Sequence, residues 1–272
     1  MLALLLVLSI KAFAQTFEGT ITWSVDMEIT DPAVKAQMAE SQKAMQDPAK
    51  IKEMEEQMNS PQFKAMMEQN PQMKEQMERM LAMMKSGGGM NSMMPSGMIL
   101  KIKDKNSLFK MEGGIVVNEF LSLDGETKTY SINRENKTYA VMEPPAQQQD
   151  NTGESKAKVT KTDERATIAG YPSTKYIVES MDGGTKTVSS IWATTELKGV
   201  DYKSMAKRKF TRSKQNFFYE EIEGFPMKVV QNLPQGTVTI EVKSVKKESL
   251  PASDFVAPSE ASGYKLVKGM GL

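Results

Sequence analysis

The sequence predicts an α+β protein in which a mostly antiparallel sheet is interrupted, after its first strand, by a methionine-rich helical insertion. Three observations lead to this prediction: an alternating apolar strand within 15–30, a segment at 31–97 rich in helix formers, and strand patterns again over 98–272. With 272 residues, 39% hydrophobic and 25% charged, the composition is that of a globular protein. A formal charge of +1 gives no reason to expect nucleic-acid binding.

The segment 1–14 has the pattern of a signal peptide. An apolar run over 2–10 is followed by the small-x-small sequence Ala12-Phe13-Ala14, so cleavage is expected between Ala14 and Gln15. The run is too short to span a bilayer, and the alternative is an N-terminal strand or anchor. We therefore expect an exported protein, in the periplasm or outside the cell.

The first strand lies in GTITWSVDMEI. Apolar Ile21, Trp23 and Val25 alternate with polar residues, and a period of two predicts one buried face and one solvated face. Because the same pattern returns only after the insertion, we expect this strand to pair with the later sheet.

Four N-cap and proline pairs divide the segment from 31 to 85. They are Asp31-Pro32, Asp47-Pro48, Ser60-Pro61 and Asn70-Pro71. A capping side chain followed by proline at the first helical position marks a helix start, so four short helices are expected. The glycine-rich stretch Ser86–Gly97 is expected to connect the last helix to the sheet.

The segment 98–272 is expected to complete a sheet of roughly eight to ten strands. Its alternating runs are separated by turn sequences such as Asp124-Gly125, Asn133–Asn136 and Pro234-Gln235-Gly236, and tight turns imply antiparallel pairing. A basic, predicted helical stretch over 201–214 would contact anionic lipid headgroups or a partner, or form a solvated helix face. Its cations are Lys203, Lys207, Arg208, Lys209, Arg212 and Lys214.

Several motifs together resemble those of a family of exported bacterial proteins described as a domain of unknown function. They are GTITWSVDMEITDP followed by DPxxK helices, TYSINRENKTYAV, TIAGYPSTKYIV, W-x-T-x-x-L, GFPMKV and LPASDFVAPSEASGY. Their order and the closing F-x-x-P…Y element are similar to the periplasmic lipoprotein-carrier fold. The resemblance implies a curved sheet, an open half-barrel, whose concave side holds helices or a hydrophobic ligand. Lipoprotein carriers lack so long an insertion, which could fill the cavity that a carrier keeps open.

The composition removes the commonest catalytic groups. The chain has no histidine and no cysteine, so a neutral-pH general base and a thiol nucleophile or metal ligand are missing. The sequence contains no nucleophile elbow, P-loop or dinucleotide fingerprint, and no spacing singles out a pair of carboxylates. We predict a protein that is not an enzyme, with no catalytic, cofactor-binding or metal-binding residues and no cofactor.

Methionines form apolar stripes at helical spacing. The stripes are Met73, Met77, Met80 and Met84; Ile51, Met54 and Met58; and Val34, Met38 and Met45. The opposite face of the last helix is polar, and its Lys74–Glu78 and Glu75–Arg79 pairs are spaced for weak i,i+4 attraction.

Three interpretations of these stripes remain open. They could pack on the sheet or on each other, or form an adaptable surface for a lipid chain, an apolar segment or an envelope partner. Thioethers also favour Cu(I), which Met77 and Met80 would hold together with Met73 or Met84. The predicted function is an exported binding protein for a hydrophobic ligand or an envelope partner. The alternatives are a periplasmic Cu(I)-binding or copper-tolerance protein and a purely structural envelope protein.

Overall fold

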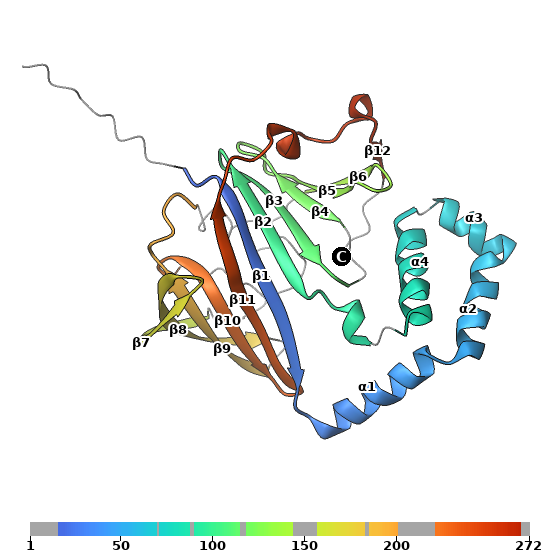
Figure 1. The fold of residues 1–272 in the computed structure, drawn as a ribbon, viewed down its shortest axis with the longest axis horizontal. Coiled ribbons are helices and arrows are strands. Elements are labelled where there is room, and N and C mark those ends of the chain that lie inside the picture. Colours follow the sequence, from blue (N-terminus) through green and yellow to red (C-terminus); the bar gives the residue numbers. More distant parts are fainter. Residues whose placement is uncertain are drawn as a thin grey trace, which may run out of the picture.

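The computed structural model describes residues 16–69, 71–87, 90–114, 118–143, 157–182, 185–200 and 221–267. The predicted signal peptide and the basic stretch over 201–214 lie outside these residues, as do residues 88 and 89 of the predicted connector. Figure 1 shows a broad sheet with a chain of helices beside it. Within the described ranges, no helix is both long and apolar enough to cross a membrane.

The described residues form a twelve-stranded sheet in the order β12-β6-β5-β4-β3-β2-β1-β11-β10-β9-β8-β7. The strands are β1 (Gly19–Ile29), β2 (Gly97–Lys103), β3 (Asn106–Glu112), β4 (Glu119–Ser122), β5 (Thr129–Asn133), β6 (Thr138–Met142), β7 (Lys158–Ile168), β8 (Tyr171–Asp182), β9 (Thr185–Thr194), β10 (Phe225–Leu233), β11 (Gly236–Lys247) and β12 (Lys265–Leu266). The β12–β6 pair is parallel, and the other neighbouring strands pair antiparallel. The predicted α+β class with a mostly antiparallel sheet is confirmed.

The first strand occupies the middle of this sheet. β1 pairs with β11 along its whole length and with β2 over Gly19–Ser24. Both partner strands follow the insertion in the sequence. The expected pairing with the later sheet is therefore confirmed. After Val25, whose N–H still bonds to the carbonyl of Ser96, the described residues place no second strand beside β1. Met27 is accordingly 44% exposed although it continues the apolar alternation.

The expected count of eight to ten strands is wrong. The segment TIAGYP contains a tight turn that separates β7 from β8, and the short β12 adds a further strand. At this turn Ala169 and Gly170 have φ of 48° and 84°, the left-handed conformation that type I′ hairpins require. Alanine seldom adopts this conformation. The asparagine or aspartate that normally signals such a turn is absent at this position, so the sequence did not predict it.

Helices α1 (Pro32–Met45), α2 (Pro48–Asn59), α3 (Pro61–Gln69) and α4 (Pro71–Lys85) form the insertion. Each begins at a predicted proline, because proline needs no hydrogen bond for its nitrogen in the first turn. The Asp31 side chain accepts hydrogen bonds from the backbone N–H groups of Ala33 and Val34, at 2.7 and 3.0 Å. A 3₁₀ helix, η1 (Met90–Met93), then leads into β2.

The sheet curls at its β7 end, so that β7 comes back toward β11. We call the face inside this curl the inner face. It carries the main apolar core, in which the rings of Trp23 and Phe225 lie 5.9 Å apart. Leu100 on β2 belongs to this core. Leu108 on β3 pairs with Lys101, the residue after Leu100, so Leu108 points to the opposite face, which we call the outer face.

A second, smaller cluster lies on the outer face. It consists of Leu108, Leu121, Tyr130, Ile132, Leu250 and Phe255. Leu250 and Phe255 come from the segment after β11, including the 3₁₀ helix η2 (Ala252–Phe255), which covers this part of the sheet. The C-terminal segment therefore protects the outer face of β3–β6.

Candidate functional site

The four helices form an arm that packs mainly on itself. We call residues Pro32–Lys85 the methionine arm. Figure 1 shows α1 leaving the end of β1, α2 and α4 side by side, and α3 joining them. Helices α2, α3 and α4 contact one another, and α1 contacts α2 and η1. Each of these contacts is more extensive than any contact between one of the four helices and a strand.

The methionine stripes of the first two helices are only half-buried. Neither α1 nor α2 has a buried residue. The half-buried stripe residues are Val34, Met38, Met45, Ile51, Met54 and Met58. These side chains are therefore not sealed in a core, either within the arm or against the sheet.

The last two helices contain the two buried methionines of the arm. Met67 on α3 and Met84 on α4 are 5% and 6% exposed, whereas Met73, Met77 and Met80 are half-buried. The interpretation of the stripes as a packed core thus applies to Met67 and Met84. Met73, Met77 and Met80 beside them keep part of their surface exposed.

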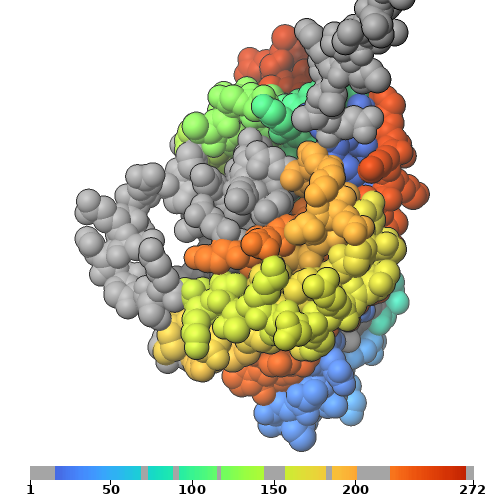
Figure 2. Space-filling view, turned by 90° about the vertical axis from the view of Figure 1, so that its left-hand side faces the viewer, coloured from blue at the N-terminus to red at the C-terminus, as the bar shows by residue number. Residues whose placement is uncertain are grey.

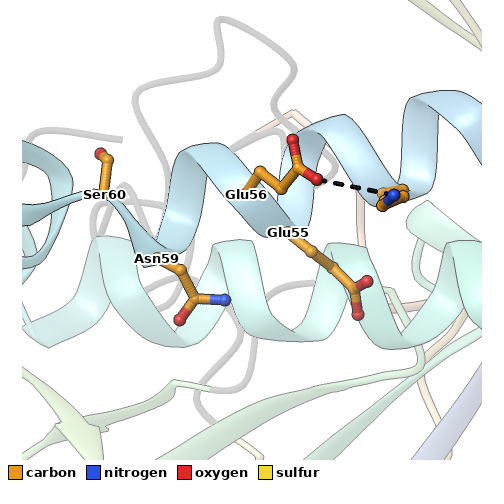
Figure 3. A pocket seen from close by; sticks show the side chains of 5 residues that line it. Glu55, Glu56, Asn59 and Ser60 are labelled. Atoms are coloured by element: carbon orange, nitrogen blue, oxygen red, sulfur yellow. Dashed lines mark ion pairs between the residues drawn. The ribbon is translucent and has the colours of Figure 1, made fainter.

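Polar contacts join α4 and the residues after it to α2 and to the end of α1. Lys85 forms an ion pair with Glu55, and the side chain of Gln46 donates a 3.0 Å hydrogen bond to the carbonyl of Gly87. An open hollow of about 450 Å³ lies beside the ion pair, lined by Lys52, Glu55, Glu56, Asn59 and Ser60. Figure 3 shows Glu56 paired with a lysine, and the two side chains are 70% and 77% exposed. This hollow has solvated, charged walls and suits an apolar ligand poorly.

The carboxylate of Glu75 joins the arm to the sheet. It accepts hydrogen bonds from the side-chain amide of Asn133, at the end of β5, and from that of Asn136, at 2.6 Å, in the turn between β5 and β6. Its other oxygen pairs with Arg79 at 3.1 Å, and Arg79 also reaches Glu135 in the same turn. We call these contacts the Glu75 latch.

The latch corrects one expectation. The i,i+4 pair of Glu75 and Arg79 is present, but Glu75 is 9% exposed and does not lie on a solvated face. Its burial depends on a turn about 60 residues further along the chain. Nothing in the periodicity of α4 signals that contact, although the Asn-rich sequence of the turn offers free amide donors.

The latch lies at the border of the inner face. Phe120 on β4 pairs with Ser131 on β5, and Asn133 follows two residues later on the same face. The rings of Phe109 and Phe120 lie 6.3 Å apart on that face. Helix α4 therefore meets the sheet where the aromatic part of the inner face ends.

The outer face of the curled half carries charges. Lys175 on β8 and Lys228 on β10 lie over the ring of Trp192, at 5.0 and 5.7 Å from its centroid, on the two strands that flank β9. Lys228 also pairs with Glu241 at 2.8 Å and, as the main cause, holds the pKa of that carboxyl below its usual value. This charged face therefore suits an apolar ligand less well than the methionine stripes do.

Figure 2 shows the β7–β8 hairpin spread across the side of the molecule away from the arm. Its edge strand β7 is rich in charged residues and has a register shift between Lys161 and Arg165. Charges and irregular pairing prevent an edge from adding further strands. This edge is therefore a poor docking site for an extended peptide.

Comparison with known proteins gives a family. A family model described as a domain of unknown function, DUF4412, matches residues 117–261, just over half of the chain. The match begins after β3, so the methionine arm lies outside it. No curated protein matches the sequence.

One similar solved structure is the crystal structure of LprF from Mycobacterium bovis. The similarity covers 59% of this chain and 82% of that chain, with 12% identity and a TM-score of 0.29. Similarity at this level supports no inference about function. The family match confirms the resemblance that the sequence motifs indicated: the chain belongs to the DUF4412 family, a family of unknown function.

Proposed function

We propose that this protein is an exported, non-enzymatic binding protein for a hydrophobic ligand, and that the methionine arm supplies the binding surface. One observation carries the proposal: the stripes of α1 and α2 are half-buried, in an arm that packs mainly on itself. Methionine side chains are unbranched and adaptable, and they suit apolar ligands of varied shape.

The energy available favours a long apolar ligand. Full burial of a methionine side chain contributes about 1.5–3 kcal/mol, so completing the burial of one of these half-buried side chains contributes at most roughly a third of that. Association and the ordering of side chains cost at least about 4 kcal/mol. A ligand must therefore cover several methionines at once, and an acyl chain lying along two helices would do so.

Two parts of the sequence extend the proposal to the cell envelope. The signal-peptide pattern of 1–14 implies export to the periplasm or the exterior. The basic residues between Lys203 and Lys214 would allow peripheral contact with anionic membranes, where an acyl ligand is obtained or delivered.

Lipid extraction and mass spectrometry of the purified protein test the proposal, together with titration of a fluorescent fatty acid. We compare a variant with Met54, Met77 and Met80 changed to glutamine and one with the same residues changed to leucine. Glutamine should weaken binding at least about tenfold, because it adds polar groups that the ligand would bury. Leucine should change it by less than about threefold. Met181→Gln, at an exposed position on β8, is the matched control.

The leucine variant also distinguishes fatty-acid binding from the alternative function, Cu(I) binding. The thioethers of Met77 and Met80 are half-buried and so within reach of a small ion. Leucine keeps the apolar surface but removes the sulfur ligands, so Cu(I) binding would be lost while fatty-acid binding remains. An extract without lipid, no binding of the fluorescent probe and no Cu(I) binding would leave the structural alternative.

A further inference from the structure

We propose that the Glu75 latch holds α4, and with it the methionine arm, against the sheet, and that its release lets the arm swing away and opens its half-buried methionine stripes to a ligand. This inference concerns regulation of the proposed binding surface and rests on the proposed function for its biological meaning. The motion itself is a separate claim about the molecule.

The contacts of Glu75 are those of a latch and not of a packed interface. A single carboxylate receives both asparagine amides and Arg79, while α4 and the strands contact each other only weakly around it. Hydrogen bonds to a charged group are strong and directional, and they are lost over a small displacement. Water can replace them once the carboxylate is exposed, so the open state is not penalised by an unpaired charge.

The turn that receives α4 keeps its own shape without the latch. The Oδ1 of Asn133 accepts a 2.9 Å hydrogen bond from the backbone N–H of Asn136, which leaves the Nδ2 of each residue for Glu75. β5 and β6 pair from Asn133–Thr138 onward. Release therefore frees α4 without requiring the hairpin to rearrange.

The ends of the arm provide pivots. At its start, the backbone N–H groups of Thr30 and Asp31 both donate to the carbonyl of Gln235, at 2.9 and 3.2 Å. After its end, the backbone of Ser96 is bonded to Val25 and Glu112, at 2.9 and 2.8 Å. These contacts hold both ends to the sheet, while the latch holds helix α4. At the end of α4, Gly87 has a φ of 73°, a conformation that glycine adopts without strain and that suits a pivot.

Distances between two spin labels test the motion. The chain has no cysteine, so Met66→Cys on α3 and Val141→Cys on β6 place labels at two sites only. Both side chains are exposed, at 44% and 37%, so labelling leaves the packing intact. The background protein should give one narrow distance distribution.

Two latch variants and one control are compared in this background. Glu75→Gln removes the charge of the latch. Asn136→Asp keeps that charge and places a second carboxylate opposite Glu75, so that the two repel. Asn136 is exposed, so this change leaves the core undisturbed. Both should shift the distribution to longer distances and broaden it. Glu78→Gln, the same change on the exposed side of the same helix, should not. Far-UV circular dichroism checks that each variant is folded.

Binding of the fluorescent fatty acid separates the latch from the proposed function. If the latch limits access, Asn136→Asp should bind at least about threefold more tightly than Glu78→Gln, because more molecules are open. An unchanged distance distribution in folded Glu75→Gln and Asn136→Asp would overturn the latch, even if fatty acid still binds. Longer distances without any fatty-acid binding would support the latch and overturn the proposed function.

Discussion

The Nζ of Lys103 lies 2.6 Å from one carboxylate oxygen of Glu18, and the same oxygen accepts a 2.7 Å hydrogen bond from the backbone N–H of Leu250. The lysine also donates to the carbonyl of Leu250 at 2.9 Å. Three segments distant in sequence meet here: the residue before β1, the end of β2 and the chain after β11. These partners, with Lys103 as the largest cause, hold the pKa of Glu18 below its usual value.

This contact predicts a pH dependence of stability. A carboxyl whose pKa is lowered by folding stabilises the native state fully above its unfolded pKa of about 4.3, and this contribution is lost as pH falls through the lower folded value. Glu18→Gln should therefore be less stable than the wild type at neutral pH, and the difference should shrink below roughly pH 4. Urea unfolding over a pH series measures it. Glu53→Gln on α2 is the control, and the prediction fails if both variants follow the same pH profile.

Phe225 should be a large contributor to the stability of the inner core. Its ring is fully buried and lies against Trp23. Truncation of a buried phenylalanine to alanine costs about 3–5 kcal/mol in free energy of unfolding. Phe225→Ala should show this loss in urea unfolding, whereas Val256→Ala, at an exposed position, should stay within about 0.5 kcal/mol. A loss below about 1 kcal/mol at Phe225 would mean that the core relaxes around the cavity.

The cap of α2 should act locally. The side chain of Asp47 accepts a 2.9 Å hydrogen bond from the backbone N–H of Ala49. Asp47→Ala should cost about 1 kcal/mol and speed amide hydrogen exchange in α2 roughly fivefold, because an N-cap satisfies an otherwise free donor. Asp47→Ser should restore most of the protection. Equal acceleration throughout the sheet would instead indicate that the arm and the sheet unfold together.

The turn at Ala169 offers a stabilising substitution. With φ of 48° it occupies the first central position of a hairpin turn, followed by Gly170. Asparagine tolerates this conformation, so Ala169→Asn should raise the free energy of unfolding by about 0.5–1 kcal/mol. Ala169→Val should lower it, since β-branched residues are strained there. Thermal unfolding of both variants measures the difference, and a lower midpoint for Ala169→Asn would contradict the assigned turn geometry.

Helix starts and most turns were readable from the sequence because their causes act over a few residues. Asp31 and Asp47 cap the helices whose first residues they precede, and Gly125 and Gly236 mark turns at predicted positions. The alternation around Ile21 identified a strand. The turn at Ala169 was missed because alanine carries no preference for its conformation.

The remaining features depend on which segments meet. No local pattern tells that β1 lies between β2 and β11, that Glu75 is buried by Asn133 and Asn136, or that Met84 is enclosed while Met77 is only half-covered. Periodicity shows that a methionine lies on an apolar face, whereas its exposure depends on how closely another element approaches that face. The composition and helical spacing of the arm are therefore properties of its sequence, while its attachment to the β5–β6 turn through Glu75 and Arg79 arises only from the folded arrangement.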